Sequence, residues 1–117
     1  MESKIKISSF DDGLLIKFYG EVDSSKCQLY RFKIRDEMIK VGPRMLLFDF
    51  KEVTFLDSSG IGLILGRYNE MCKIRGIVGL INLNPYTKKI MKISGLFQIM
   101  NEYKSLADFK KKEGITI

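Results

Sequence analysis

The hydrophobic positions near the start of the chain alternate with polar ones, which is the period of a half-buried strand. The alternating apolar residues are Ile5, Ile7, Leu14, Ile16 and Phe18, and Asp11-Asp12-Gly13 interrupts them. Two alternating runs around a short polar segment with glycine are typical of a β-hairpin. We therefore predict a hairpin in the first twenty residues, with its turn at Asp12-Gly13.

Two longer segments have apolar residues at spacings of three and four, which predicts amphipathic helices. The first begins near Ser24 and ends at Gly42-Pro43; the second begins near Ser58, and Gly76 suits the left-handed position after it. The expected inward residues are Cys27, Tyr30, Ile34, Met38 and Val41 in the first helix and Ile61, Ile64, Leu65, Tyr68 and Cys72 in the second.

Residues 45–50 and 77–83 are short, nearly unbroken apolar runs, which indicate central strands covered on both faces. Asn84-Pro85 is a strong helix start. The apolar side of this helix is expected at Tyr86, Ile90 and Ile93, with Gly95 after its end. Residues 98–101 fit a short edge strand, and the segment from Ser105 to Asp108 resembles a capping box that opens a last helix through Phe109.

These elements predict the order β-β-α-β-α-β-α-β-α, with helix-crossed strands parallel and the N-terminal hairpin antiparallel. The fold class is α/β, with a mixed sheet of about five strands and about four helices. A length of 117 residues fits one domain, residues 1–117.

Composition excludes several classes of function. The chain has no histidine, so His-based metal sites and Ser-His or Cys-His catalysis are ruled out. No apolar run reaches the length of a membrane span, and the N-terminus shows no secretory signal, so we expect a cytoplasmic protein without a membrane partner. Cys27 and Cys72 are expected to be reduced, packed thiols. The net charge is +6, but its lysines fall mostly on polar helix faces without interleaved aromatics, so no direct nucleic-acid partner is expected.

The stretch Asp57-Ser58-Ser59-Gly60-Ile61-Gly62 carries the most distinctive chemistry. A serine nucleophile needs a base, and the sequence offers neither a histidine nor a lysine one turn after either serine, so we expect no enzyme activity. Gly60-Ile61-Gly62 follows a strand as in a dinucleotide site, but the third glycine is replaced by Leu65. No cofactor is predicted.

One of Asp57 and Ser58 is expected to cap the second helix. Capping does not explain Gly60 and Gly62, which each cost about 1 kcal/mol relative to alanine in a helix. We expect these glycines to leave room for a docking protein. A phosphate on a hydroxyl at this helix start would add about −1.5 to −2 charges and disturb a docked partner.

The run Phe55-Leu56-Asp57-Ser58-Ser59-Gly60-Ile61-Gly62 resembles the signature of the STAS domain in its anti-sigma factor antagonist form, and most resembles the sporulation type. Gly20-Glu21-Val22-Asp23 and Ser94-Gly95-Leu96-Phe97 resemble two further motifs of that family, whose first loop has leucine where Val22 stands. The likeness extends over nearly the whole chain.

The resemblance implies a partner that is both an anti-sigma factor and a serine kinase. Binding frees the sigma factor, phosphorylation of the antagonist at Ser58 ends the interaction, and a PP2C-type phosphatase reverses it. The implied partner contacts are Glu21, Asp23, Asp57, Ser59, Gly60, Ile61, Gly62 and Arg67.

Several alternatives stay open at this stage. Asp23 is otherwise only a cap of the first helix, and Arg67 is otherwise a solvated helix residue. The domain is alternatively a STAS module that senses a nucleotide or another small ligand, or an antagonist in a general-stress cascade.

Overall fold

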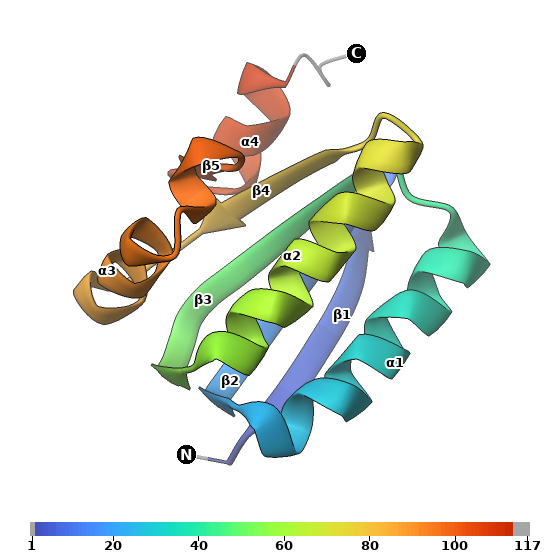
Figure 1. Ribbon diagram of the computed structural model, residues 1–117. Helices are drawn as coiled ribbons and strands as arrows, with labels where there is room; N and C mark the ends of the chain where they lie inside the picture. The colour runs from blue at the N-terminus through green and yellow to red at the C-terminus, as the bar shows by residue number, and fades with distance from the viewer. Residues whose placement is uncertain (1, 114–117) are drawn as a thin grey trace.

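The computed structural model describes residues 2–113 of the chain and shows a five-stranded sheet in the order β1-β2-β3-β4-β5 (Figure 1). The strands are β1 (Lys4–Phe10), β2 (Gly13–Val22), β3 (Met45–Leu56), β4 (Ile77–Ile81) and β5 (Asn101–Tyr103). β1 pairs with β2 antiparallel, and the other three pairs are parallel. The predicted element order and fold class are confirmed.

Helices cover both faces of this sheet. α1 (Ser24–Val41), α2 (Ser58–Lys73) and α3 (Pro85–Ile93) contribute to the larger apolar core, and α4 (Leu106–Lys112) contributes Phe109 to a smaller one. Successive residues of β3 alternate between them, because Leu46 and Phe48 belong to the larger core and Met45 and Leu47 to the smaller. The unbroken apolar run in this strand therefore reflects burial on both sides.

The N-terminal hairpin turns one residue earlier than predicted. Phe10 and Gly13 are paired, so the two-residue loop is Asp11-Asp12, and Asp11 takes the positive φ of 44°. Gly13 is instead the first strand residue. A Cβ on it would lie 2.6 Å from the Phe10 ring, so the missing side chain lets that ring cover the strand.

Several predicted boundaries are wrong. β3 continues to Leu56 instead of ending at residue 50, and β4 ends at Ile81 instead of residue 83. α2 ends at Lys73, and Arg75 rather than Gly76 adopts the left-handed conformation after it, with a φ of 57°. Gly76 serves close packing, since a Cβ there would meet the Met71 side chain at 2.5 Å. Residues 96–98 form a short 3-10 turn, η1 (Leu96–Gln98), so the last strand occupies Asn101–Tyr103 instead of residues 98–101.

The inward faces of three helices also differ from the prediction, since Val41 at the end of α1 is 47% exposed. In α3 the buried residues are Thr87 and Met91, whereas Tyr86 and Ile93 are 40% and 74% exposed. The packed-thiol prediction holds for Cys27 but is wrong for Cys72, which is exposed on α2. None of the helices between residues 2 and 113 is long and apolar enough to cross a membrane.

Candidate functional site

The starts of α1 and α2 lie side by side at one edge of the sheet (Figure 1). β2 and β3 are parallel, and Val22 at the end of β2 pairs with Leu56 at the end of β3. Each strand is followed directly by a helix, so the sheet brings two segments together that are far apart in the sequence. We call Glu21, Asp23, Asp57, Ser58 and Ser59 the helix-start edge.

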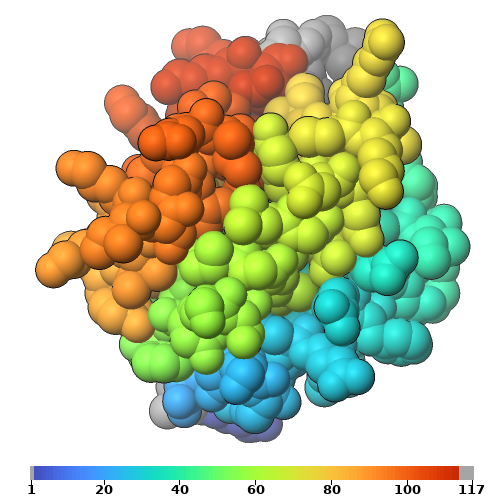
Figure 2. Space-filling view, in the orientation of Figure 1, coloured from blue at the N-terminus to red at the C-terminus, as the bar shows by residue number. Residues whose placement is uncertain are grey.

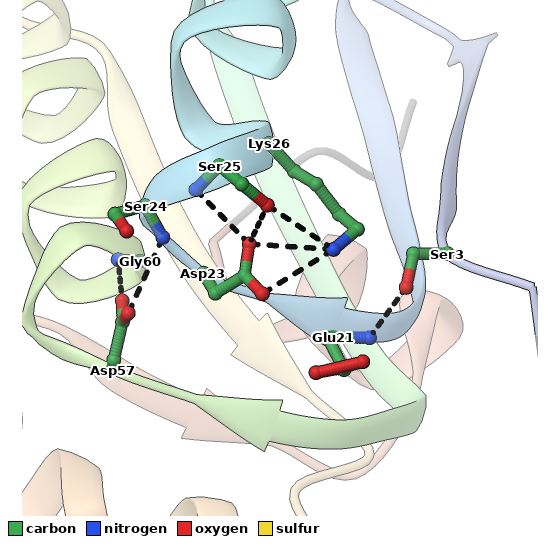
Figure 3. A network of polar contacts seen from close by, with 8 residues as sticks. All are labelled: Ser3, Glu21, Asp23, Ser24, Ser25, Lys26, Asp57 and Gly60. Atoms are coloured by element: carbon green, nitrogen blue, oxygen red, sulfur yellow. Dashed lines mark hydrogen bonds and ion pairs between the residues drawn. The ribbon is translucent and has the colours of Figure 1, made fainter.

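Asp57 is the central structural residue of this edge. Its Oδ1 accepts hydrogen bonds from the backbone N–H groups of Ser59, at 2.9 Å, and Gly60, at 3.1 Å. Its Oδ2 accepts from the backbone N–H of Ser24 at 3.2 Å (Figure 3). One carboxylate therefore caps α2 and also holds the first residue of α1, which satisfies amides that have no partner within either helix. Of the two predicted caps, Asp57 is the one that forms.

Asp23 caps α1. Its Oδ1 accepts hydrogen bonds from the backbone N–H of Ser25, at 3.1 Å, and from the Ser25 hydroxyl, at 2.7 Å. Lys26 Nζ lies 3.3 Å from Oδ2 (Figure 3). The Ser25 hydroxyl, assisted by Lys26, holds the pKa of the Asp23 carboxyl below its usual value. The carboxylate stays ionised and half-buried at the edge. The predicted role of Asp23 as a cap of the first helix is therefore confirmed.

Ser58 is the first residue of α2 and is exposed. Within residues 2–113 its hydroxyl has no hydrogen-bond partner, in contrast to the neighbouring Asp57 carboxylate. Because the cap fixes the backbone on both sides of Ser58, the hydroxyl is presented on a rigid helix start while remaining accessible to another protein.

Gly60 and Gly62 have different surroundings, which corrects part of the sequence interpretation. Gly60 is buried, and a Cβ on it would lie 2.5 Å from Leu56 Cδ1 and 2.8 Å from the Val22 carbonyl oxygen. Its small size serves the packing of α2 on the strand ends, not an approaching partner. Gly62 is exposed, and a Cβ on it would meet no atom within 4 Å, so here the surface is open.

The end of β3 is held by α3. The Tyr86 hydroxyl donates to the Leu56 carbonyl and accepts from the Leu56 N–H, both at 3.2 Å. The side chain of Asn84, the cap of α3, donates to the Val53 carbonyl at 3.1 Å. β4 pairs with β3 only as far as Asp49, so these side chains replace strand partners just before Asp57.

The remaining predicted residues occupy different depths. Glu21 is exposed at the end of β2, where its backbone N–H donates to Ser3 Oγ at 3.0 Å. Ile61 is 8% exposed and belongs to the larger core. Arg67 is 4% exposed and paired with Glu70 at 2.7 Å, so the alternative of a solvated Arg67 is wrong. Nine residues of helix, about 13 Å, separate it from Ser58.

Sequence reasoning missed a groove that adjoins the helix-start edge. It has a volume of about 370 Å³ and lies between the N-terminal halves of α1 and α2, which Figure 2 shows next to each other. Arg67 lines it together with Ser24, Gln28, Arg31 and Ser59. The sequence shows only that Arg67 and Glu70 are three residues apart and can pair on one helix. The groove itself could not be predicted, because its other wall is α1, which the sheet brings close to α2.

The buried cysteine near this edge, Cys27, also lines the groove. Burial, reinforced by the Asp57 and Asp23 carboxylates, raises the pKa of the Cys27 thiol to about 11. Within the described part of the chain, no three acidic or thiol side chains come close enough to hold a metal ion. The chemistry that the edge offers is an exposed serine hydroxyl beside carboxylates.

Comparison with known proteins agrees with this arrangement. The family model of the STAS domain matches residues 4–109. The chain is 28% identical over 103 residues to the anti-sigma F factor antagonist of Paenibacillus polymyxa, covering 88% of each chain. It is 26% identical to the solved anti-sigma factor antagonist SpoIIAA in its unphosphorylated form, with a TM-score of 0.83 over 97% of this chain and 100% of the other. The phosphorylated form of SpoIIAA from Bacillus is also 26% identical and matches with a TM-score of 0.74 over 92% of this chain and 98% of the other.

Proposed function

Since the chain belongs to the STAS domain family, we propose that it is an anti-sigma factor antagonist switched off by phosphorylation of Ser58. Its unphosphorylated form binds an anti-sigma factor that is also a serine kinase, and this binding releases the sigma factor. The observation that carries the proposal is the exposed Ser58 hydroxyl on a helix start whose backbone Asp57 fixes. That a solved relative is described in a phosphorylated form supports a phosphate switch.

The kinase is proposed to dock on the helix-start edge and the adjoining Gly62. Glu21, Asp23 and Asp57 give this surface negative charge, and Gly62 leaves it free of bulk. Gly60 and Ile61 support the surface from within, because both are buried. Arg67 is proposed to contact the kinase from the neighbouring groove, two and a half turns along α2 from Ser58.

Phosphorylation at Ser58 alters this surface more than the protein beneath it. A phosphate adds about two negative charges and three acceptor oxygens. The α2 dipole favours that charge, whereas Asp57 and Asp23 oppose it. A partner that fits the unmodified edge loses shape and charge complementarity, so the complex dissociates until a PP2C-type phosphatase removes the phosphate.

In this proposal the protein is a regulatory substrate and not an enzyme. The Ser58 hydroxyl oxygen forms a bond to the γ-phosphorus of ATP, ADP leaves as the bond to the γ-phosphoryl group breaks, and the hydroxyl proton goes to a base of the kinase. The carboxylate of Asp57 is occupied by three backbone N–H groups. We assign the cycle to the bacterial cytoplasm.

The decisive experiment is intact-mass measurement and peptide mapping after incubation with the cognate anti-sigma kinase and ATP. Wild-type protein should gain one phosphate, on Ser58. Ser58→Ala should bind the kinase but gain none, whereas the matched Ser59→Ala should be phosphorylated normally. Phosphate on Ser58→Ala at the wild-type rate would show that another residue is the acceptor and would overturn the proposed switch.

The choice between a sporulation and a general-stress cascade depends on the sigma factor that is released. We propose the sporulation type, because the relative from Paenibacillus polymyxa is an antagonist of an anti-sigma F factor. Transcription assays with the purified kinase and each candidate sigma factor test this choice: release of a general-stress sigma factor alone would contradict it.

A further inference from the structure

The sheet face opposite α1 and α2, which lie in front of the sheet in Figure 1, carries four lysines. The larger core takes alternate residues of β1 and β2, and the residues between them lie on the opposite face. Lys4, Lys6 and Lys17 are three of these residues. Lys51 joins them at a bulge in β3, where Lys51 and Glu52 both lie between two residues of the larger core. We call Lys4, Lys6, Lys17 and Lys51 the lysine face.

The protein itself does not neutralise the charge of the lysine face. None of its four lysines forms an ion pair in the part of the chain that the structure describes. Asp49 lies opposite Lys17, but it is 6% exposed and accepts hydrogen bonds from the Asn82 side chain and the Lys51 backbone N–H, both at 3.0 Å. Even with Asp49 and the half-buried Glu52 counted, the positive charges on this face exceed the negative ones.

The arrangement of the lysines is unfavourable for the isolated fold. Lys6 and Lys17 are directly opposite each other in the antiparallel pair of β1 and β2. Like charges at opposite positions destabilise a sheet, so the fold gains nothing from this pair. Lys4 and Lys17 both place Nζ over the Tyr19 ring, at 4.8 and 5.2 Å from its centroid. The ring attracts the two ammonium groups and so keeps the like charges close together.

We propose that the lysine face binds an extended acidic segment of a partner protein. Carboxylates compensate the ammonium groups that lack counter-ions here. Lys4 and Lys6 lie two residues apart on one strand, about 7 Å, which is also the spacing of alternate side chains in another extended chain. A segment with glutamates at alternate positions therefore matches them.

A nucleic acid fits this surface less well. Single-stranded nucleic acids bind through bases stacked on aromatic rings, but the Tyr19 ring is already occupied by the Lys4 and Lys17 ammonium groups. The inference does not depend on the antagonist function, because the lysine face lies across the sheet from the larger core that α2 covers.

The test is a titration of the full chain with a synthetic peptide that alternates glutamate and serine, followed by the amide NMR signals. The matched peptide has glutamine in place of glutamate, and the ionic strength is held constant with sodium chloride. The amides of Lys6, Lys17, Tyr19 and Lys51 should shift together and saturate with the acidic peptide only. The double variant Lys6→Gln/Lys51→Gln should weaken binding at least tenfold, since two charge-assisted contacts are lost.

The matched control is Lys89→Gln/Lys92→Gln, which removes the same charge from exposed positions of α3. It should leave the affinity for the acidic peptide within about twofold of wild type. Lys6 and Lys51 are exposed and lie outside both apolar cores, and the spectra show that each variant is folded.

Two outcomes would overturn the proposal. Absence of saturable shifts, or equal weakening by Lys89→Gln/Lys92→Gln, would mean only diffuse attraction of anions to a basic protein. Tighter binding of a single-stranded DNA oligonucleotide of equal charge, with the same amides shifting, would make the partner a nucleic acid instead of an acidic protein segment.

Discussion

Gly60 and Gly62 are two residues apart in the first turns of α2, yet alanine at these positions should have opposite effects on stability. Gly60→Ala should destabilise the fold by about 1–3 kcal/mol, because its Cβ would overlap Leu56 and the Val22 backbone. Gly62→Ala should stabilise it by up to about 1 kcal/mol, because it meets open space and reduces the freedom of the unfolded chain. Urea unfolding of both variants beside wild type measures the difference.

Kinase binding separates the roles of these glycines further. Gly62→Leu adds bulk to the exposed surface and should impair docking while the fold is retained. Equal losses of stability in Gly60→Ala and Gly62→Ala would show that both glycines serve packing, against the structure described above.

The two cysteines should differ sharply in reactivity. Cys27 is buried with a pKa of about 11, so its thiol stays protonated at pH 8, and only above about pH 11 is the thiolate the major form. Cys72 is exposed. Iodoacetamide at pH 8 should therefore modify Cys72 first, and peptide mass mapping detects the modified residue. The Cys72→Ser variant is the control: it should remain unmodified when folded and should react at Cys27 when denatured. Rapid native labelling of Cys27 would mean that the start of α1 opens readily.

At the scale of elements, α3 shows why helical periodicity alone gave an inward face that is only partly right, since Ile90 packs against the larger core but Tyr86 and Ile93 do not. The predicted stripe contained Tyr86 and Ile93, but the short helix packs beside the overhanging end of β3, where unpaired backbone groups need partners. Tyr86 meets that need with its hydroxyl at Leu56. Periodicity records which residues are apolar, and it does not record where a neighbouring strand lacks hydrogen bonds.

Removing the Tyr86 hydroxyl should loosen the end of β3 without disturbing the core. Tyr86→Phe keeps the ring but leaves both Leu56 groups without this partner, so we expect a loss of about 1 kcal/mol in urea unfolding. Amide exchange at Leu56 should accelerate as well. Tyr19→Phe on β2 is the control and should change neither the free energy of unfolding nor the exchange rate at Leu56. Unchanged exchange at Leu56 in Tyr86→Phe would show that this pair of hydrogen bonds does not hold the strand.

At the scale of the whole molecule, the sequence predicted the architecture because apolar period and turn residues are local signals. The hairpin, the central strand of residues 45–50 and the Asn84-Pro85 helix start all appear in the structure. The start of α2 was predictable as well, but the bridge from Asp57 to Ser24 was not, since it joins residues 33 positions apart. The burial of Arg67 was missed for the same reason: its environment is made by α1, which the sheet brings alongside α2.

Phosphorylation of Ser58 should leave the rest of the molecule unchanged. Ser58 touches neither apolar core, and solved relatives in both phosphorylation states share this fold. The attraction of the α2 dipole and the repulsion of Asp57 act in opposite directions, so the free energy of unfolding should change by less than about 0.5 kcal/mol. Hydrogen exchange of the phosphorylated protein, with kinase-treated Ser58→Ala as control, should differ only at the starts of α1 and α2 and the ends of β2 and β3. Altered protection in α4, on the other face of the sheet, or in β5, at the far edge of the sheet, would mean that the switch acts through the fold and not only through its surface.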